Sequence, residues 1–212
     1  TDHSTVKAAR DVEVAANSVQ EVVSVSASLG ASGTVGVAGS VSVLSFDNQT
    51  WASIGDDAVV DAGGNVVVKA DDDTATTLVA GTVALGIGGG GIGAGVGITL
   101  IDKDTRAWIG NRAVVDGRGQ GSTALTAYSG DGVDLTTAMR GVQVQARSHE
   151  NLFTVSAAGA GGLYVGFAGA ASVATVDSDT LAYIGNGAQI NTQAGAAHDD
   201  QDVNVSARND LR

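Results

Sequence analysis

Two short patterns recur along the chain and constrain its fold more than any other feature. The first is TxAxIGxxAxV, which reads TWASIGDDAVV at 50–60, TRAWIGNRAVV at 105–115 and, with Ile in the last place, TLAYIGNGAQI at 180–190. The second is VxVxA, at 12–16, 66–70, 142–146 and 203–207. The spacing from the first Val of VxVxA to the Thr that opens the next TxAxIGxxAxV is 38, 39 and 38 residues in the three units. Such a constant period is typical of solenoids, whose repeats pack on their neighbours.

The patterns divide the chain into one repeat array, 1–212. The expected units are 12–65, 66–141, 142–202 and the start of a further unit at 203–212. The second unit contains an insertion at 117–141, and such an insertion either binds a partner or is a tolerated surface bulge. Neither end of the chain has an obvious polar cap, so we expect the array to continue in the parent protein.

Each unit contains a long uncharged stretch, and the three copies are 22–46, 74–101 and 152–176. Branched apolar residues alternate there with Gly, Ala and Ser, which is the periodicity of a β-strand. Clusters of Gly divide each stretch into two strands and favour a hairpin. The small face should allow another backbone to approach closely, and we expect both faces to be covered.

The predicted fold is therefore all-β: a right-handed parallel β-solenoid with Gly-rich β-hairpins forming an added sheet. Composition agrees, because 43% of residues are hydrophobic, Pro is absent, and 20 of the 23 acidic residues are Asp, which favours turns over helices. We expect Ile54, Ile109 and Ile184 to form one buried ladder. The net charge of −12 with only 11 Lys and Arg argues against nucleic acid as a partner.

The two patterns and the alternating Gly/Ala/Ser-rich stretches resemble repeats of large bacterial filamentous adhesins, the filamentous-haemagglutinin-like and leukotoxin-type exoproteins. The resemblance covers nearly the whole chain. It implies a β-solenoid stalk on the bacterial surface or secreted from the cell, in a setting of adhesion, biofilm formation and virulence. The matching motifs contain no catalytic residue, so the resemblance implies no enzymatic activity.

Candidate metal ligands are four aspartates in two repeated pairs, Asp102 with Asp104 and Asp177 with Asp179. Calcium prefers several such oxygen ligands at one place, although these residues also suit a solvated turn. The three histidines are isolated and there is no GxSxG motif. We therefore expect no enzyme and no cofactor, with calcium as the one ion to consider.

Candidate contact residues for a ligand or partner are aromatic: Trp51, Trp108, Tyr183 and Tyr128. The first three are expected on the strand face opposite Thr50, Ala52 and Ile54. An outward aromatic residue either binds a ligand or packs under a neighbouring loop.

The function predicted from the sequence is a non-catalytic structural stalk or adhesion segment of a large secreted or surface-attached bacterial exoprotein. Its expected partners are neighbouring repeats and a host or matrix glycan or protein. One alternative is a glycan-binding or glycan-active β-helix module. Another is a membrane-inserting β-hairpin module of a toxin, which the Gly density and missing polar lumen disfavour.

Overall fold

The fold was analysed in a computed structural model that describes residues 3–128, 136–192 and 196–212. Its regular elements are all strands. Their bounds are β1 Thr5–Ala8, β2 Val12–Ser32, β3 Gly36–Ile54, β4 Val59–Ala62, β5 Val66–Gly86, β6 Gly90–Ile109, β7 Val114–Gly117, β8 Leu125–Tyr128, β9 Thr136–Gly162, β10 Val165–Ile184, β11 Gln189–Ile190 and β12 Gln201–Leu211.

Three parallel sheets run along the molecule, with strand orders β1-β4-β7-β11, β10-β6-β3 and β12-β9-β5-β2. Each turn of the chain contributes one strand to each sheet, so consecutive repeats stack as rungs. The register pairs equivalent positions of the repeat, for example Thr50 with Thr105 and Thr105 with Thr180. The predicted all-β repeat solenoid is confirmed, and its handedness stays a prediction.

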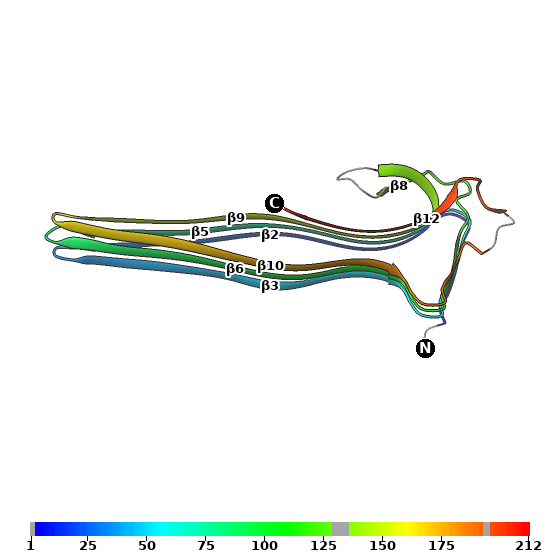
Figure 1. The fold of residues 1–212 in the computed structure, drawn as a ribbon, viewed down its shortest axis with the longest axis horizontal. Coiled ribbons are helices and arrows are strands. Elements are labelled where there is room, and N and C mark those ends of the chain that lie inside the picture. The colour runs from blue at the N-terminus through cyan, green and yellow to red at the C-terminus, as the bar shows by residue number, and fades with distance from the viewer. Residues whose placement is uncertain (1–2, 129–135, 193–195) are drawn as a thin grey trace.

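The molecule has a broad end and a long thin end (Figure 1). We call the broad end the base, where all three sheets enclose an interior. The thin end is the fin, residues 22–46, 74–101 and 152–176, where only the two sheets of long strands face each other. The neck is the short region between them, residues 17–21, 47–49, 71–73, 102–104, 147–151 and 177–179.

The base has an apolar interior built from the two recurring patterns. Ile54 and Ile109 are buried, and Ile184 packs partly buried on the same cluster, which confirms the predicted ladder. Val66 and Val68 of β5 are fully buried opposite them. The inward positions of TxAxIG and VxVxA therefore explain why these residues recur.

The turn after each Ile-Gly is held by contacts between rungs. The second residue after the glycine adopts a left-handed backbone, with φ of 55° at Asp57, 56° at Arg112 and 71° at Gly187. The side chain of Asp56 accepts a hydrogen bond from the Asn111 backbone at 2.7 Å. Arg112 donates to Asp57, and this bond holds the pKa of the Asp57 carboxyl below its usual value.

The Gly-rich tips differ from the predicted hairpins in one respect. β2 pairs with β5, and β3 pairs with β6, so the tip at 33–35 joins strands in two different sheets. The two arms of each stretch face each other through their side chains. Period-two alternation is the same for both arrangements, which is why the pattern alone did not distinguish them.

The small residues of the fin face inward, as predicted for a packing surface. A Cβ atom added at Gly93 would lie 2.8 Å from the backbone oxygen of Gly159 in the facing sheet. The expectation that both faces are covered is wrong for the described residues. Val41 is 66% exposed and Leu29 is 74% exposed, so the branched aliphatic residues line the outside of the fin.

Part of the insertion at 117–141 forms a short antiparallel addition to the solenoid. β8 pairs with the first residues of β9, Leu125 with Met139 and Tyr128 with Thr136. Gln143 donates a 2.9 Å hydrogen bond to the Thr126 carbonyl and fixes the addition to β9. Residues 129–135 of the insertion lie outside the described residues.

The isoleucine ladder can be tested by truncating its central member. We expect Ile109→Ala to lower the free energy of unfolding by about 2–5 kcal/mol, because it leaves a cavity in a fully buried site. The matched control is Ile87→Ala, since Ile87 is 72% exposed and should tolerate the change. Urea unfolding followed by circular dichroism measures both, and equal midpoints would contradict the inward assignment.

The close approach of the two sheets in the fin can be tested at glycine. We expect Gly93→Val to cost about 1–3 kcal/mol or more by overpacking against the facing backbone. Gly81→Val is the control, because Gly81 faces outward with its nearest neighbour, the Ser26 oxygen, 3.9 Å from the added Cβ. Valine is the better strand former, so the control should be neutral or stabilising in thermal melts. A higher melting temperature for Gly93→Val would mean that the inward face is open to water.

Candidate functional site

A cluster of buried charges occupies the neck. Lys103 of β6 is fully buried, and its ammonium forms ion pairs with Asp72 of β5 and Glu150 of β9, both also fully buried. The Lys103 Nζ to Glu150 Oε1 distance is 3.0 Å. One cation thus bridges two carboxylates from the facing sheet, and the cluster carries a formal charge of −1.

Hydroxyl and amide groups from the other rungs complete this cluster. Thr50 donates to Asp72 at 2.8 Å, and Asn48 donates to the same carboxylate. Ser178 donates to Glu150 Oε1 at 2.9 Å. Within the described residues, Glu150 Oε2 has no hydrogen-bond partner, and the Lys103 ammonium is held by its two ion pairs.

Sequence reasoning missed this cluster, although the alternation contained the signal. Lys103 lies two residues before the inward Thr105, and Asp72 lies two residues after the inward Ala70. Both were therefore on inward-facing positions. Comparing the repeats did not reveal them, because Lys103 aligns with Asn48 and Ser178 and no residue type recurs at that position.

The predicted aromatic residues Trp51, Trp108 and Tyr183 come together on the outer face of the β10-β6-β3 sheet. The ring centroids of Trp108 and Tyr183 are 6.0 Å apart with nearly parallel planes, and Trp51 meets Trp108 edge-on at 6.3 Å. The Arg106 guanidinium lies 5.8 Å from the Trp51 ring centroid. Ring faces are used here in contacts between rungs, which favours a packing role.

Tyr128 lies apart from these three, on β8. Its ring is contacted by the guanidinium of Arg208 at 5.4 Å, and Asn204 donates to its backbone carbonyl. The structure therefore separates the four aromatic candidates into two places. Their role as ligand contacts stays a prediction.

The four candidate metal ligands lie on the same outer face of the β10-β6-β3 sheet as Trp51, Trp108 and Tyr183. Register pairs Asp102 with Asp177 and Asp104 with Asp179, so each pair spans neighbouring rungs. Asp104 is engaged by Arg106 at 2.5 Å. Across the described ranges, no group of three or more His, Asp or Glu side chains is arranged to hold a metal ion. Calcium binding at these residues stays a prediction.

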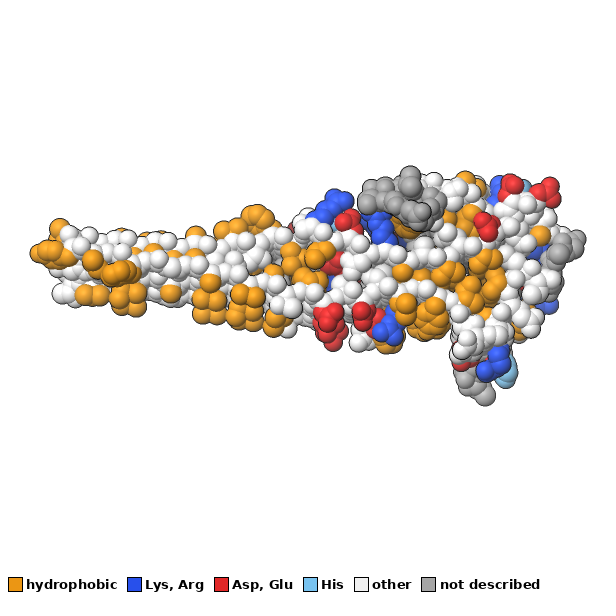
Figure 2. Space-filling model, viewed as in Figure 1, with side chains coloured by type: hydrophobic (Ala, Val, Ile, Leu, Met, Phe, Trp, Pro, Cys, Tyr) orange, Lys and Arg blue, Asp and Glu red, His pale blue; other side chains and the backbone are white. Residues whose placement is uncertain are grey.

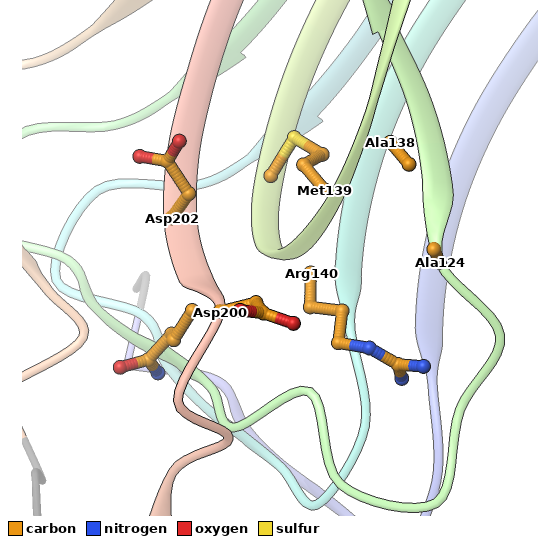
Figure 3. A pocket seen from close by; sticks show the side chains of 7 residues that line it. Ala124, Ala138, Met139, Arg140, Asp200 and Asp202 are labelled. Carbon is orange, nitrogen blue, oxygen red and sulfur yellow. The ribbon is translucent and has the colours of Figure 1, made fainter.

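An open hollow of about 360 Å³ lies between the insertion and β12 (Figure 3). Its polar side chains include Arg140, Asp200 and Asp202. Arg140 donates to the backbone carbonyls of Gly119 and Ser122, so it fixes the insertion to the solenoid. This use of Arg140 indicates a structural contact rather than a catalytic group.

Comparison with known proteins identifies no relative: no protein-family model, curated protein or solved structure matches the chain. The part of the chain that the structure describes has no helix long and apolar enough to cross a membrane.

The buried cluster can be tested by removing its cation. We expect Lys103→Met to lower the free energy of unfolding by about 3–5 kcal/mol, because two buried carboxylates then lose their counter-charge. Adding Asp72→Asn and Glu150→Gln should recover most of that loss, since no buried charge remains. Urea unfolding midpoints of the unsubstituted chain, the Lys103→Met variant and the triple variant measure both effects. A triple variant no more stable than Lys103→Met would show that the carboxylates are not the cause.

Proposed function

We propose that the chain is a non-catalytic structural segment, a stalk or adhesion element, of a large secreted or surface-attached bacterial exoprotein. The observation that supports this most directly is the repetition of one rung in register, as in the ladder Ile54, Ile109 and Ile184. Because each rung contacts only its neighbours, adding rungs lengthens the molecule without forming an enclosed site.

The filled interior also supports a structural role. Aliphatic side chains fill the base, ion pairs and hydroxyls fill the neck, and the fin is filled by Leu78 and Ile101 near the neck and by small residues toward the tip. Three hollows among the described residues are open and lie on outer surfaces. An enzyme needs acid, base or nucleophilic groups that converge on one accessible place. The buried Lys103 cluster has converging charges but is closed to solvent.

The edges of the array support a longer solenoid. β2 and β3 end their sheets on one side, and β10 and β12 end them on the other. Exposed strand edges of this kind are places where further rungs pair. The proposal therefore places this chain among neighbouring repeats of the same type.

A tandem chain tests the proposal. Residues 1–202 followed by residues 12–212 place Val12 where Val203 stands, so the repeat continues across the junction. Rungs are about 4.8 Å apart, and three added rungs should lengthen the solenoid by about 14 Å along its axis. Small-angle scattering measures the length, and one cooperative unfolding transition at a higher melting temperature should accompany it.

Two results would contradict the proposal. Two independent unfolding transitions at the original melting temperature would show that the rungs do not extend one another. Turnover of a neutral or acidic polysaccharide, abolished by substituting a single aspartate such as Asp102, would show that the chain is an enzyme.

A further inference from the structure

The outer face of the β10-β6-β3 sheet is uncharged along the whole fin and apolar except at Ser45 and Thr175. The three fin stretches contain no Asp, Glu, Lys, Arg or His. Val41 is 66% exposed and Phe167 is 64% exposed on this face. Figure 2 shows the thin end of the molecule without the red and blue of charged side chains. A contiguous apolar surface of this kind usually marks an interaction site.

Side chains on this face form rows across the three strands, because the register is exact from rung to rung. We name each row by its β3 residue. From tip to neck, the rows are Val37 (with Ile92 and Phe167), Gly39 (with Ala94 and Gly169), Val41 (with Val96 and Ala171), Val43 (with Ile98 and Val173), Ser45 (with Leu100 and Thr175) and Asp47 (with Asp102 and Asp177).

We propose that this face binds the same face of a second copy of the chain, with the two fins antiparallel and the two solenoid axes parallel. The two-fold axis runs along the Val41 row, so that this row meets itself. The Gly39 row then lies opposite the partner's Val43 row, and the Val37 row lies opposite the partner's Ser45 row. The small Gly39 row thereby receives the large Val43 row, as in dry interdigitated sheet contacts.

The aspartates at the neck select this orientation. With both fins pointing the same way, the Asp47 row would face its own copy, and six carboxylates would meet across a contact that excludes water. In the antiparallel arrangement, the Asp47 row lies beyond the edge of the contact, opposite the partner's uncharged tip. Like-charge repulsion therefore disfavours the parallel alternative.

The strand edges favour a second chain over a lipid bilayer as the occupant. Among the described residues, β2 and β3 end their sheets along one side of the fin, and β10 ends its sheet along the other. Hydrocarbon satisfies none of the backbone groups on these edges, and each unsatisfied group costs several kcal/mol. In a face-to-face pair of fins, the edges stay in water or pair with further rungs while the apolar faces are covered.

The contact area is sufficient for a weak dimer and grows with the array. Three strands spaced about 4.8 Å apart and about 11 residues long present roughly 500 Å² per copy. The total of about 1,000 Å² is at the lower limit for a specific interface. Each further rung adds the same strip on both copies, so longer arrays should associate more tightly.

Sedimentation velocity of the isolated chain, from about 1 µM to about 200 µM, tests the proposal, with reversible dimers expected in the upper part of that range. Val41→Asp and Val41→Lys should each weaken dimerisation at least about tenfold, because Val41 faces its own copy. An equal mixture of these two variants should dimerise again. Val25→Asp is the matched control, because Val25 is equally exposed at 67% on the other outer face and should leave dimerisation unchanged.

Circular dichroism checks that each variant is folded. If a charged variant does not fold, Val41→Ser is used in its place. A chain that stays monomeric throughout overturns the proposal. So does a mixture of Val41→Asp and Val41→Lys that stays monomeric, or a dimer disrupted by Val25→Asp instead. Monomeric chain that co-sediments with phosphatidylcholine vesicles would show that lipid is the occupant.

Discussion

The parallel register between rungs is the constraint on which the rest of the structure depends. The long strands align with their neighbours without a break in register; β2 pairs with β5 from Val12 to Ser32, and β3 pairs with β6 from Gly36 to Ile54. Because side chains alternate between faces, a slip of one residue would exchange inside and outside along the entire strand. The in-register stack therefore explains at once the isoleucine ladder of the base, the neighbouring Trp51, Trp108 and Tyr183 on its outer face and the inward-facing small residues of the fin.

The fin alone specifies this register weakly, because Gly, Ala, Val and Ser recur at every second position. A slip of two residues would keep the small face inward and change little there. The neck is different, since the same slip of β6 would move Lys103 away from Asp72 and Glu150 and leave all three charges without a partner. Buried ion clusters are weak evidence for stability, but they strongly disfavour arrangements in which a charge is buried alone. The three charged residues thus distinguish between alignments that the repeating small residues leave equivalent.

Much of the architecture followed from the sequence, because the repeat and the alternation are both direct consequences of stacking. The inward side chains of Thr50 and Ile54, the outward Trp51 and the tight packing of the fin glycines were all predicted correctly. The alternation indicates that a strand has two different faces, but it does not indicate which of the two faces is covered. It also does not distinguish arms that hydrogen-bond to each other from arms that face each other across two sheets. The neck cluster was hidden for another reason, since its column changes residue type from rung to rung and so is invisible to a search for repeated residues.

β5 shows why the two ends of the molecule have different surfaces. From the base to the neck, its inward residues include Val66 and Val68, and its outward residues include Lys69 and Asp71, as expected of a protein in water. Beyond the buried Leu78 the arrangement is reversed, so that Ala80 and Ala84 point inward while Val83 and Leu85 are exposed. The change follows from geometry, because three sheets enclose room for branched side chains, whereas the two facing sheets leave room for Leu78 and Ile101 near the neck but approach closely at the glycines toward the tip. The outward aliphatic residues of the fin do not contribute to its interior, so their hydrophobic free energy is available only to whatever covers the outer faces. An apolar outer surface kept over three successive rungs is therefore better explained by an intermolecular contact than by the folding of the single chain.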